Sequence, residues 1–406
     1  MSLSIAEKLP QYVISVMDAL SAAGYRGYLV GGSLRDLLRG VEPHDFDLTT
    51  DATPDEMTAA FAAFRVIPTG LSHGTLTVLS EGHPIEVTTH RCDGAYLDAR
   101  HPESVSFTRR LADDLSRRDF TINAMAWNAE LGLVDLFGGQ HDLAAGLIRA
   151  VGDPATRFGE DALRILRAFR FSAQLDFEID AATLAAAREM REGLAKISAE
   201  RIFSELSRLL TSPAAARGLE AVLNTACEPL VFGDIAIDRA ALATLAALPP
   251  RAEVRLAALL YGETPERARA LCRSLRSSNA FSDTVVGLLR AMGTPLPTTA
   301  PEARRFTVTH WSVWEDALAV LAARGTDTAG AHALCRTVSR DGTAVELRRL
   351  AVNGKELQER VGVLPLKTAR LLAELQALVW EDPTRNKKAT LLALAAELLA
   401  KESELL

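Results

Sequence analysis

The sequence predicts an α/β head at the N-terminus, followed by a long all-α body and tail. Three observations predict this fold class. Strand-like segments occur within about the first 150 residues, one of them runs into a glycine-rich turn and a short helix, and Ala/Leu-rich helical periodicity dominates beyond that point. With 406 residues, 48% of them hydrophobic, the chain is long enough for two or more domains with a substantial buried core.

A pair of glycines separates the first predicted strand of the head from a short helix. Tyr28 to Val30 is an apolar run, and Ser33 is placed to cap a helix from Leu34 to Arg39 that Gly40 can end. At Gly31-Gly32 the backbone has no Cβ atoms, so a phosphate can approach it, and the free N–H groups of a helix start favour negative charge. We therefore expect a triphosphate cradle at this turn.

An acidic pair follows about a dozen residues later. In a strand through Asp45-Phe46-Asp47, alternate side chains share a face, so the two carboxylates project together while Phe46 turns into the core. Adjacent carboxylates repel each other, and a divalent cation with oxygen ligands relieves that repulsion at neutral pH. Each motif alone is more often an ordinary turn or a solvated strand end, but together they predict a metal site beside a phosphate cradle.

Local signals predict the remaining elements of the head. We expect an amphipathic helix over residues 1–24 that is interrupted near Pro10, a capped helix from Thr53 through Phe64, and a hairpin of residues 74–79 and 85–89. In the second hairpin strand, Glu86 can share the aspartates' face as a third catalytic carboxylate, or it can be an exposed strand residue. Residues 91–107 have no periodicity, and a loop of this length is often functional.

A row of charged residues marks the first helices beyond the head. Helical periodicity over Glu160 to Phe171 places one acidic and three basic side chains on one side, namely Asp161, Arg164, Arg167 and Arg170. An exposed ladder of ion pairs explains such a stripe equally well. The alternative is nucleotide recognition, because Asp161 only accepts and Arg164 only donates, which matches the base edges of C and A and clashes with G and U. Arg167 and Arg170 can then hold the triphosphate.

Composition restricts the setting of the protein. Four widely spaced cysteines without a Cys-x-x-Cys pair indicate neither a zinc site nor a disulfide framework. The sequence contains no basic N-terminal region followed by an apolar run and no run of roughly 18 apolar residues, so we expect a cytoplasmic protein without a membrane partner. The net charge of −7 argues mildly against nucleic acid, although local arginine clusters are candidates for phosphate binding.

Several stretches between roughly residues 25 and 210 match a family pattern in order. They are Leu29-Val30-Gly31-Gly32 with Arg35-Asp36, Asp45-Phe46-Asp47, RRDFTINA at residues 117–124, EDALR at 160–164 and ISAERI at 197–202. The glycine turn and the acidic pair resemble the signature of the polymerase-β-like nucleotidyltransferases. As a set, the stretches resemble the bacterial class II tRNA nucleotidyltransferases, the CCA-adding family, which is closely related to the bacterial poly(A) polymerases.

This resemblance implies an activity and a set of site residues. The activity is template-independent addition of C, C and A to the 3′ end of tRNA from CTP and ATP, with release of pyrophosphate. Asp45 and Asp47 would bind Mg²⁺, with Gly32 and Arg35 at the incoming nucleotide. Other matching residues would contact its triphosphate and ribose or read and hold it, namely Arg118 and Asp119, and then Asp161, Arg164, Arg167 and Arg170. The loop 91–107 would move when specificity changes from C to A.

The resemblance also implies four consecutive parts. These are a catalytic nucleotidyltransferase head over residues 1–150, a helical nucleotide-selecting neck over 151–210, a helical body over 211–299, and a helical, tRNA-binding tail over 300–406. The matches in the C-terminal half are few, mainly Val352 to Lys355 and Asn386. The sequence leaves the oligomeric state open.

Other functions remain open at this point. Within the same family, the product can be the terminal A alone or a poly(A) tail, although residues 91–98 resemble the CCA-adding type more than the tailing type. An enzyme that transfers a nucleotide to an antibiotic or a protein would share Gly32-Ser33 and the acidic pair but has no need of Asp161 with Arg164. A non-catalytic RNA-binding protein would not need intact Asp45 and Asp47.

Overall fold

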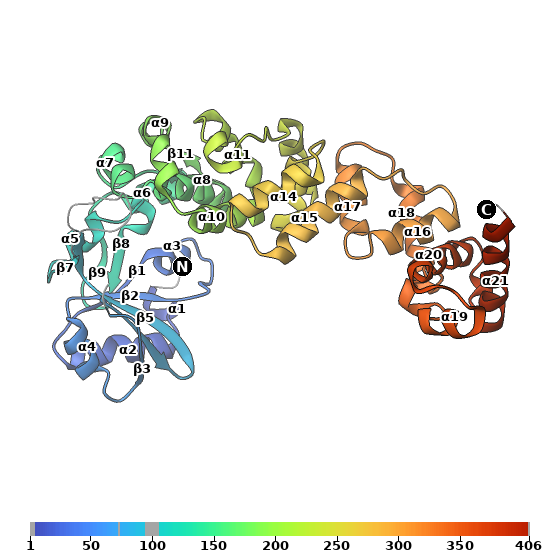
Figure 1. The fold of residues 1–406 in the computed structure, drawn as a ribbon. Helices are drawn as coiled ribbons and strands as arrows, with labels where there is room; N and C mark the ends of the chain where they lie inside the picture. Colours follow the sequence, from blue (N-terminus) through green and yellow to red (C-terminus); the bar gives the residue numbers. More distant parts are fainter. Residues whose placement is uncertain (1–4, 72–73, 94–104, 405–406) are drawn as a thin grey trace. The chain divides into compact units, whose positions relative to one another are not determined.

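The chain forms two compact units in the computed structural model, which describes residues 5–71, 74–93 and 105–404. The first unit is Met1–Ala236 and the second is Ile237–Leu406. The first unit contains a sheet with helices, and the second is helical within its described residues (Figure 1). The predicted fold class is confirmed in this respect, while the finer division into head, neck, body and tail stays a prediction.

A seven-stranded mixed sheet forms the centre of the head. Neighbouring strands pair antiparallel except β2 and β5, which run parallel and place Asp47 opposite Glu86. The acidic pair therefore lies at the start of the central strand of the sheet. In sheet order the strands are β3 (Arg65–Gly70), β4 (Thr75–Ser80), β5 (His83–Thr89), β2 (Asp47–Thr50), β1 (Gly27–Val30), β8 (Met125–Asn128) and β9 (Gly132–Asp135).

Helices pack on both faces of this sheet because successive strand residues alternate between the faces. On one face, Leu29 of β1 belongs to a large buried cluster with α1 (Ile5–Lys8), α2 (Gln11–Ala22), α3 (Gly31–Leu38) and α4 (Pro54–Ala60). On the other face, Tyr28 and Val30 pack against α5 (Leu111–Ser116). Fixing β1 from both sides also fixes the turn that follows it, where the glycines lie.

The turn after β1 differs in one respect from the prediction. The helix α3 begins at Gly31 rather than after Ser33, and the Ser33 hydroxyl donates to the Val30 carbonyl from inside the helix, at 2.8 Å. The prediction that Ser33 caps the helix is wrong because Gly31 has a φ of +68°, which lets the chain turn into the helix three residues earlier. Gly40, with a φ of +75°, follows the end of the helix as predicted.

Other predicted boundaries in the head need correction. Strand β2 begins at Asp47, so Asp45 precedes it, although Phe46 is buried as predicted. The capping box at Thr53 is present, but its helix ends at Ala60 and the chain continues into strand β3, which the sequence did not predict. The predicted hairpin of β4 and β5 is confirmed.

The predicted loop 91–107 also contains structure at both ends. Strands β6 (Arg91–Asp93) and β7 (Val105–Phe107) pair antiparallel. The rest of the predicted loop, residues 94–104, lies outside the described residues, and with it the expected movement of this segment.

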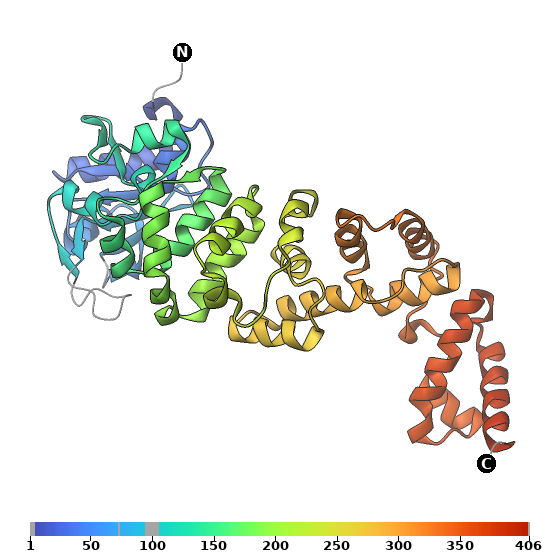
Figure 2. The ribbon, with the colours of Figure 1, turned by 90° about the horizontal axis from the view of Figure 1, so that it is seen from above.

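Helices follow the sheet within the first unit (Figure 2). They include α6 (Gly139–Ala145), α7 (Pro154–Glu160), α8 (Leu163–Leu175), α9 (Ala181–Met190), α10 (Ala199–Thr211), α11 (Ala215–Asn224) and α12 (Glu228–Phe232). The helix predicted over Glu160 to Phe171 is not continuous, because α7 ends and Asp161 takes an extended conformation with φ −145°. One strand also lies beyond residue 150, where only helices were predicted. This strand, β11 (Glu178–Ile179), pairs with β10 (Leu147–Ile148).

The second unit is built from helices in the part that the structure describes. They include α13 (Ala252–Leu259), α14 (Pro265–Ser274), α15 (Asn279–Met292), α16 (Ala300–Thr309), α17 (Trp314–Ala323), α18 (Ala329–Arg340), α19 (Gly354–Val361), α20 (Pro365–Glu381) and α21 (Lys388–Glu404). Two matching residues have structural roles here. Asn353 caps α19, and the Asn386 side chain bonds the backbone of Arg349 and Ala351.

Candidate active site

One cavity of about 610 Å³ brings together the two predicted parts of the site, which are the glycine turn with the acidic pair and the charged row on the following helix. The residues after β1, the acidic pair and the charged row of α8 all line it. It thus contains ten of the residues predicted from the sequence, namely Gly32, Arg35, Asp45, Asp47, Arg118, Asp119, Asp161, Arg164, Arg167 and Arg170. The eleventh, Glu86, lines an adjoining cavity of about 250 Å³, which Asp47 and Arg118 also line.

The acidic pair has little compensating charge of its own. Asp45 is exposed and Asp47 half-buried. Burial raises the pKa of Asp47 to about 6, and the charges of Asp45 and Glu86 add to this rise while Arg118 opposes it. A cation bound between the two aspartates would relieve both effects, so this donor set fits a divalent metal. In the described part of the chain, no group of three or more His, Cys, Asp and Glu side chains is placed to hold a metal, and Glu86 as a third carboxylate stays a prediction.

The glycine turn leaves open space between the acidic pair and two arginines. A Cβ atom on Gly31 would lie 3.5 Å from Arg118 Nη1 and 3.7 Å from Asp47 Oδ2. A Cβ atom on Gly32 would lie 3.6 Å from Arg35 Nη2. The absence of side chains here therefore keeps the backbone accessible beside charged groups of both signs, as a phosphate cradle requires.

Arg118 and its neighbour are held by a carboxylate that the sequence did not single out. Asp114 is fully buried and accepts from Arg117 at 2.6 Å and from Arg118 at 3.0 Å. Burial alone would raise the pKa of Asp114, but the Arg118 and Arg117 guanidinium groups lower it to about 2. Because this carboxylate stays ionised, it fixes the guanidinium of Arg118 at the edge of the cavity.

Asp119 has a similar role for the charged row. It accepts two hydrogen bonds from Arg167, at 2.8 and 2.6 Å, and others from the Asn123 side chain and the Phe120 N–H. These bonds outweigh its burial and lower the pKa of Asp119 to about 2. Asn123 in turn accepts from Arg35 Nη1 at 2.9 Å, so one short network links the helix after β1 to α8.

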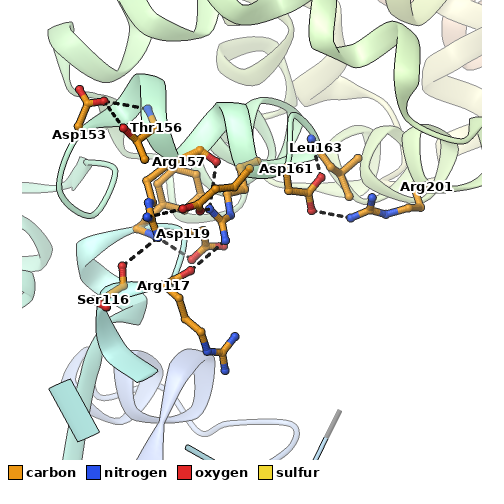
Figure 3. A network of polar contacts seen from close by, with 12 residues as sticks. Ser116, Arg117, Asp119, Asp153, Thr156, Arg157, Asp161, Leu163 and Arg201 are labelled. Atoms are coloured by element: carbon orange, nitrogen blue, oxygen red, sulfur yellow. Dashed lines mark hydrogen bonds and ion pairs between the residues drawn. The ribbon is translucent and has the colours of Figure 1, made fainter. Parts of the chain in front are cut away.

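The predicted base-reading residues, Asp161 and Arg164, are each held by other residues and not by a side-chain bond to each other. Asp161 accepts from Arg201 at 2.7 Å and from the Leu163 N–H at 3.0 Å (Figure 3). Arg164 donates to Glu160, to the Arg157 carbonyl at 3.0 Å and to the Arg117 carbonyl at 2.9 Å. The extended conformation of Asp161 lets its side chain bond the first turn of α8.

The ring of Phe171 lies among three arginines of the cavity. The guanidinium carbons of Arg35, Arg167 and Arg170 lie 5.4, 5.4 and 3.9 Å from its centroid. The ring face attracts cations, and energies of about 0.5 to 2 kcal/mol per contact are typical. Phe171 therefore helps to hold three like charges in one place.

Helix α10 supplies charged residues that sequence reasoning missed. Glu205 is buried and pairs with Arg170 at 2.7 Å and with Arg167 at 3.8 Å, while Arg201 pairs with Asp161. Arg208 lines the cavity as well. Positions 201, 205 and 208 are four and three residues apart and share one helix face, so three charged residues at helical spacing were the available signal.

These features together define a class of protein. A mixed sheet carries a glycine turn and an acidic pair, and the same cavity is lined by a row of arginines with one aspartate on the following helices. This is the arrangement of a nucleotidyltransferase head followed by a helical extension.

Comparison with known proteins identifies the family. Residues 27–149 match the profile described as the poly A polymerase head domain, and residues 176–226 match a probable RNA- and SrmB-binding site of polymerase A. The chain is 41% identical to the CCA-adding enzyme of Streptococcus mutans over 285 residues, 69% of this chain and 70% of that protein. It is 38% identical to the CCA-adding enzyme of Latilactobacillus sakei over 321 residues, 78% of this chain and 77% of that protein.

A solved structure agrees over nearly the whole length. The Bacillus stearothermophilus CCA-adding enzyme in complex with CTP superposes with a TM-score of 0.82 at 30% identity, covering 98% of this chain and 99% of that one. The chain belongs to the family of CCA-adding enzymes, which groups with the poly(A) polymerases. The resemblance inferred from the motifs is thereby confirmed. Within the described residues, no helix is both long and apolar enough to cross a membrane.

Proposed function

We propose that this protein adds C, C and A in turn to the 3′ end of tRNA, using CTP and ATP without a template and releasing pyrophosphate. The observation that carries the proposal is the single cavity lined by the acidic pair and by Asp161 with Arg164. Chemistry and monomer choice both need to act on one nucleotide, and this cavity provides groups suited to each. The CCA-adding relatives support the full CCA product over addition of the terminal A alone or a poly(A) tail.

Asp45 and Asp47 are the proposed ligands of Mg²⁺. Their charge is poorly compensated by the protein, and both line the cavity beside the glycine turn. Magnesium bound there would supply charge compensation for phosphate oxygens and a lowered pKa for the attacking 3′-hydroxyl. Glu86, opposite Asp47 on the parallel strand, is a candidate to assist from the adjoining cavity.

The glycine turn and the arginines are proposed to hold the nucleotide's triphosphate and ribose. Gly32 lets the phosphates approach the backbone, and Arg35 and Arg118 provide donors close to it. Arg118 and Arg35 each have a carboxylate partner that fixes their orientation before the nucleotide arrives. Catalysis then depends on positioning and charge rather than on a covalent enzyme intermediate.

Asp161 and Arg164 are proposed to select the base. A carboxylate has about four acceptor sites and a guanidinium has five N–H donors, so the bonds that orient this pair leave acceptors and donors for a ligand. One acceptor beside donors matches the amino group and the ring acceptors of cytosine and adenine. Guanine and uracil would place a carbonyl against the carboxylate, at a cost of roughly 1 to 3 kcal/mol per mismatch. Arg167 and Arg170 complete the row toward the phosphates.

The proposal also assigns a function to each part of the chain. Residues 1–150 would be the catalytic head, 151–210 the nucleotide-selecting neck, 211–299 the body and 300–406 a tRNA-binding tail. The contacts of Asp161 with Arg201 and of Arg170 with Glu205, all within 151–210, support a neck that acts as one element. The cytoplasm, where tRNA is matured, is the proposed location.

Primer extension on defined tRNA ends tests the function. Purified protein is given tRNA that ends at the discriminator base, after one C, or after CC, with each of the four nucleotides separately and with Mg²⁺, and the products are sequenced. We expect C on the first two substrates with CTP, and a single A on the third with ATP. Growth only of the CC-ended tRNA would instead identify an A-adding enzyme, and long A tracts on unrelated RNA would identify a poly(A) polymerase.

A further inference from the structure

One arginine of the active-site cavity differs from the others in its charge balance. Each of the other arginines that line it is paired with a carboxylate, and the partners come from the first unit. The pairs are Arg35 with Asp36, Arg117 and Arg118 with Asp114, Arg164 with Glu160, Arg167 with Asp119, Arg170 with Glu205, and Arg201 with Asp161. Among the described residues, Arg208 is the lining arginine for which no ion pair is found.

The placement of Arg208 is determined by its helix. It follows Arg201 and Glu205 on the same face of α10, and these two residues are tied to Asp161 and Arg170. The α10 face is therefore held against the charged row, and Arg208 is carried into the lining at its C-terminal end. Unlike the buried Arg170 and Glu205, Arg208 is exposed, so its guanidinium is accessible to a ligand from solution.

The charge environment of Arg208 favours an anion. Burial lowers the pKa of Arg170 to about 10 against the effect of Glu205, and the positive charges of Arg167 and Arg208 add to this lowering, so Arg208 lies within electrostatic reach of Arg170. An unpaired cation near another arginine gains stabilisation when a phosphate neutralises it. An anion-binding position inside this cavity is thus available that none of the proposed nucleotide contacts uses.

We propose that Arg208 binds a backbone phosphate of the RNA strand that is being extended. The inference rests on the proposed function, which requires the 3′ end of an RNA in this cavity next to the nucleotide. The residues assigned to the incoming nucleotide already span its base, ribose and triphosphate, and each of their arginines has a carboxylate partner. Arg208 is accessible and unpaired, and it lies at the other end of the row from Asp161 and Arg164. It is therefore available to the second polyanionic substrate, the RNA. Arg208 acts as a positioning residue that holds the primer end.

Substitution of Arg208 tests this assignment through the two substrates separately. For Arg208→Ala we expect the KM for tRNA lacking CCA to rise about five- to tenfold, with the KM for CTP and ATP and the choice of base unchanged. Binding of the same tRNA without nucleotide, followed by fluorescence anisotropy over a range of salt, should show a slope of log K against log salt reduced by about 1. Arg208→Lys keeps a charge on the same stem and should recover most of the affinity.

A matched control makes the result decisive. Arg65→Ala removes the same charge from an exposed arginine of β3 that lines neither cavity of the site, and it should leave both KM values and the salt slope unchanged. A rise in the KM for CTP and ATP with tRNA binding unchanged would overturn the proposal and assign Arg208 to the nucleotide. No change in any of these values would also overturn it. Failure of the proposed function itself is distinguishable, because it would appear in the products of the unaltered protein: no extension, growth only of CC-ended tRNA, or long A tracts on unrelated RNA.

Discussion

The two charged regions of the active-site cavity are built on opposite principles. Around the acidic pair, like charges are left together, and burial with Asp45 and Glu86 raises the pKa of Asp47 to about 6. Along α8 each arginine is paired in advance, and partners such as Asp119 are held at a pKa of about 2. The first region is incomplete without a cation, whereas the second is complete in itself.

The two regions are therefore suited to different tasks: the acidic pair to tight binding of a cation, and the paired arginines to recognition of a ligand of defined shape. A pair of uncompensated carboxylates gains most from a mobile divalent ion, because both charges are neutralised at once. Prepaired guanidinium groups gain less from each new bond but keep a defined geometry, which selection of one base edge over another requires. Substitutions in the two regions should therefore affect rate and selectivity differently.

The largest effect is expected at the acidic pair. Asp47→Asn should lower kcat at least about a thousandfold, because charge compensation at the phosphate is lost, while tRNA binding is retained. The thermal midpoint should not fall, since one of two repelling carboxylates is removed. Rapid-quench extension assays and calorimetry measure the two quantities. Asp18→Asn on α2, an exposed position, is the matched control, and an active Asp47→Asn protein would exclude the metal assignment.

Arg164→Ala should change selectivity rather than abolish chemistry. Loss of the donor side of the pair is expected to reduce the preference for C and A over G and U about 10- to 100-fold. Misincorporation with each single nucleotide on CC-ended tRNA measures it, with Arg65→Ala as the charge-matched control. Unchanged selectivity would show that the base is read elsewhere.

Acid should act on the prepaired region through Asp114. Its pKa is about 2 in the folded protein and about 3.9 when unfolded, so its stabilising contribution of about 2 kcal/mol is present above pH 4 and is lost as the pH falls toward 2. Urea unfolding of the first unit between pH 5 and 2 should therefore show a steeper loss for the unaltered protein than for Asp114→Asn. Parallel curves for the two proteins would contradict this.

The smallest effect is expected at Phe171. Phe171→Leu keeps an apolar side chain but removes the ring face that holds three guanidinium groups, so the KM for both nucleotides should rise about fivefold with base choice unchanged. Phe169→Leu is the matched control, because Phe169 is buried in the same helix without a guanidinium on its ring. Equal effects of the two substitutions would reduce Phe171 to a packing residue.

Sequence patterns predicted those parts of the site that depend on neighbouring residues. The strand before Gly31, the acidic pair around buried Phe46, and the Thr53 capping box follow from contacts within a few residues of each other. The helix boundaries that were predicted wrongly also have local causes, in the backbone conformation or hydrogen bonding of a single residue. Gly31 starts its helix early through a positive φ, and Asp161 interrupts a periodic segment by bonding the N–H of Leu163.

Partners that lie far apart in the chain were beyond prediction from periodicity. Asp161 and Arg201 are 40 residues apart, and Asp119 and Arg167 are 48 apart. Periodicity identifies which face of a helix carries charge, but it does not identify which opposing residue that face meets. For the same reason Asp114, Glu205 and Arg208 acquire their significance only in the folded protein.

The short segment from Ser116 to Asp119 serves both regions at once. The carbonyls of Ser116 and Arg117 accept from Arg157 and Arg164, while the same few residues carry Arg118 toward the acidic pair. Any displacement of α7 or α8 therefore pulls on Arg118, the arginine that is proposed to hold the triphosphate beside the acidic pair. In the proposed function, a wrongly matched base would therefore lower the reaction rate as well as the affinity. A small molecule bound behind this segment would disrupt base selection and catalysis together.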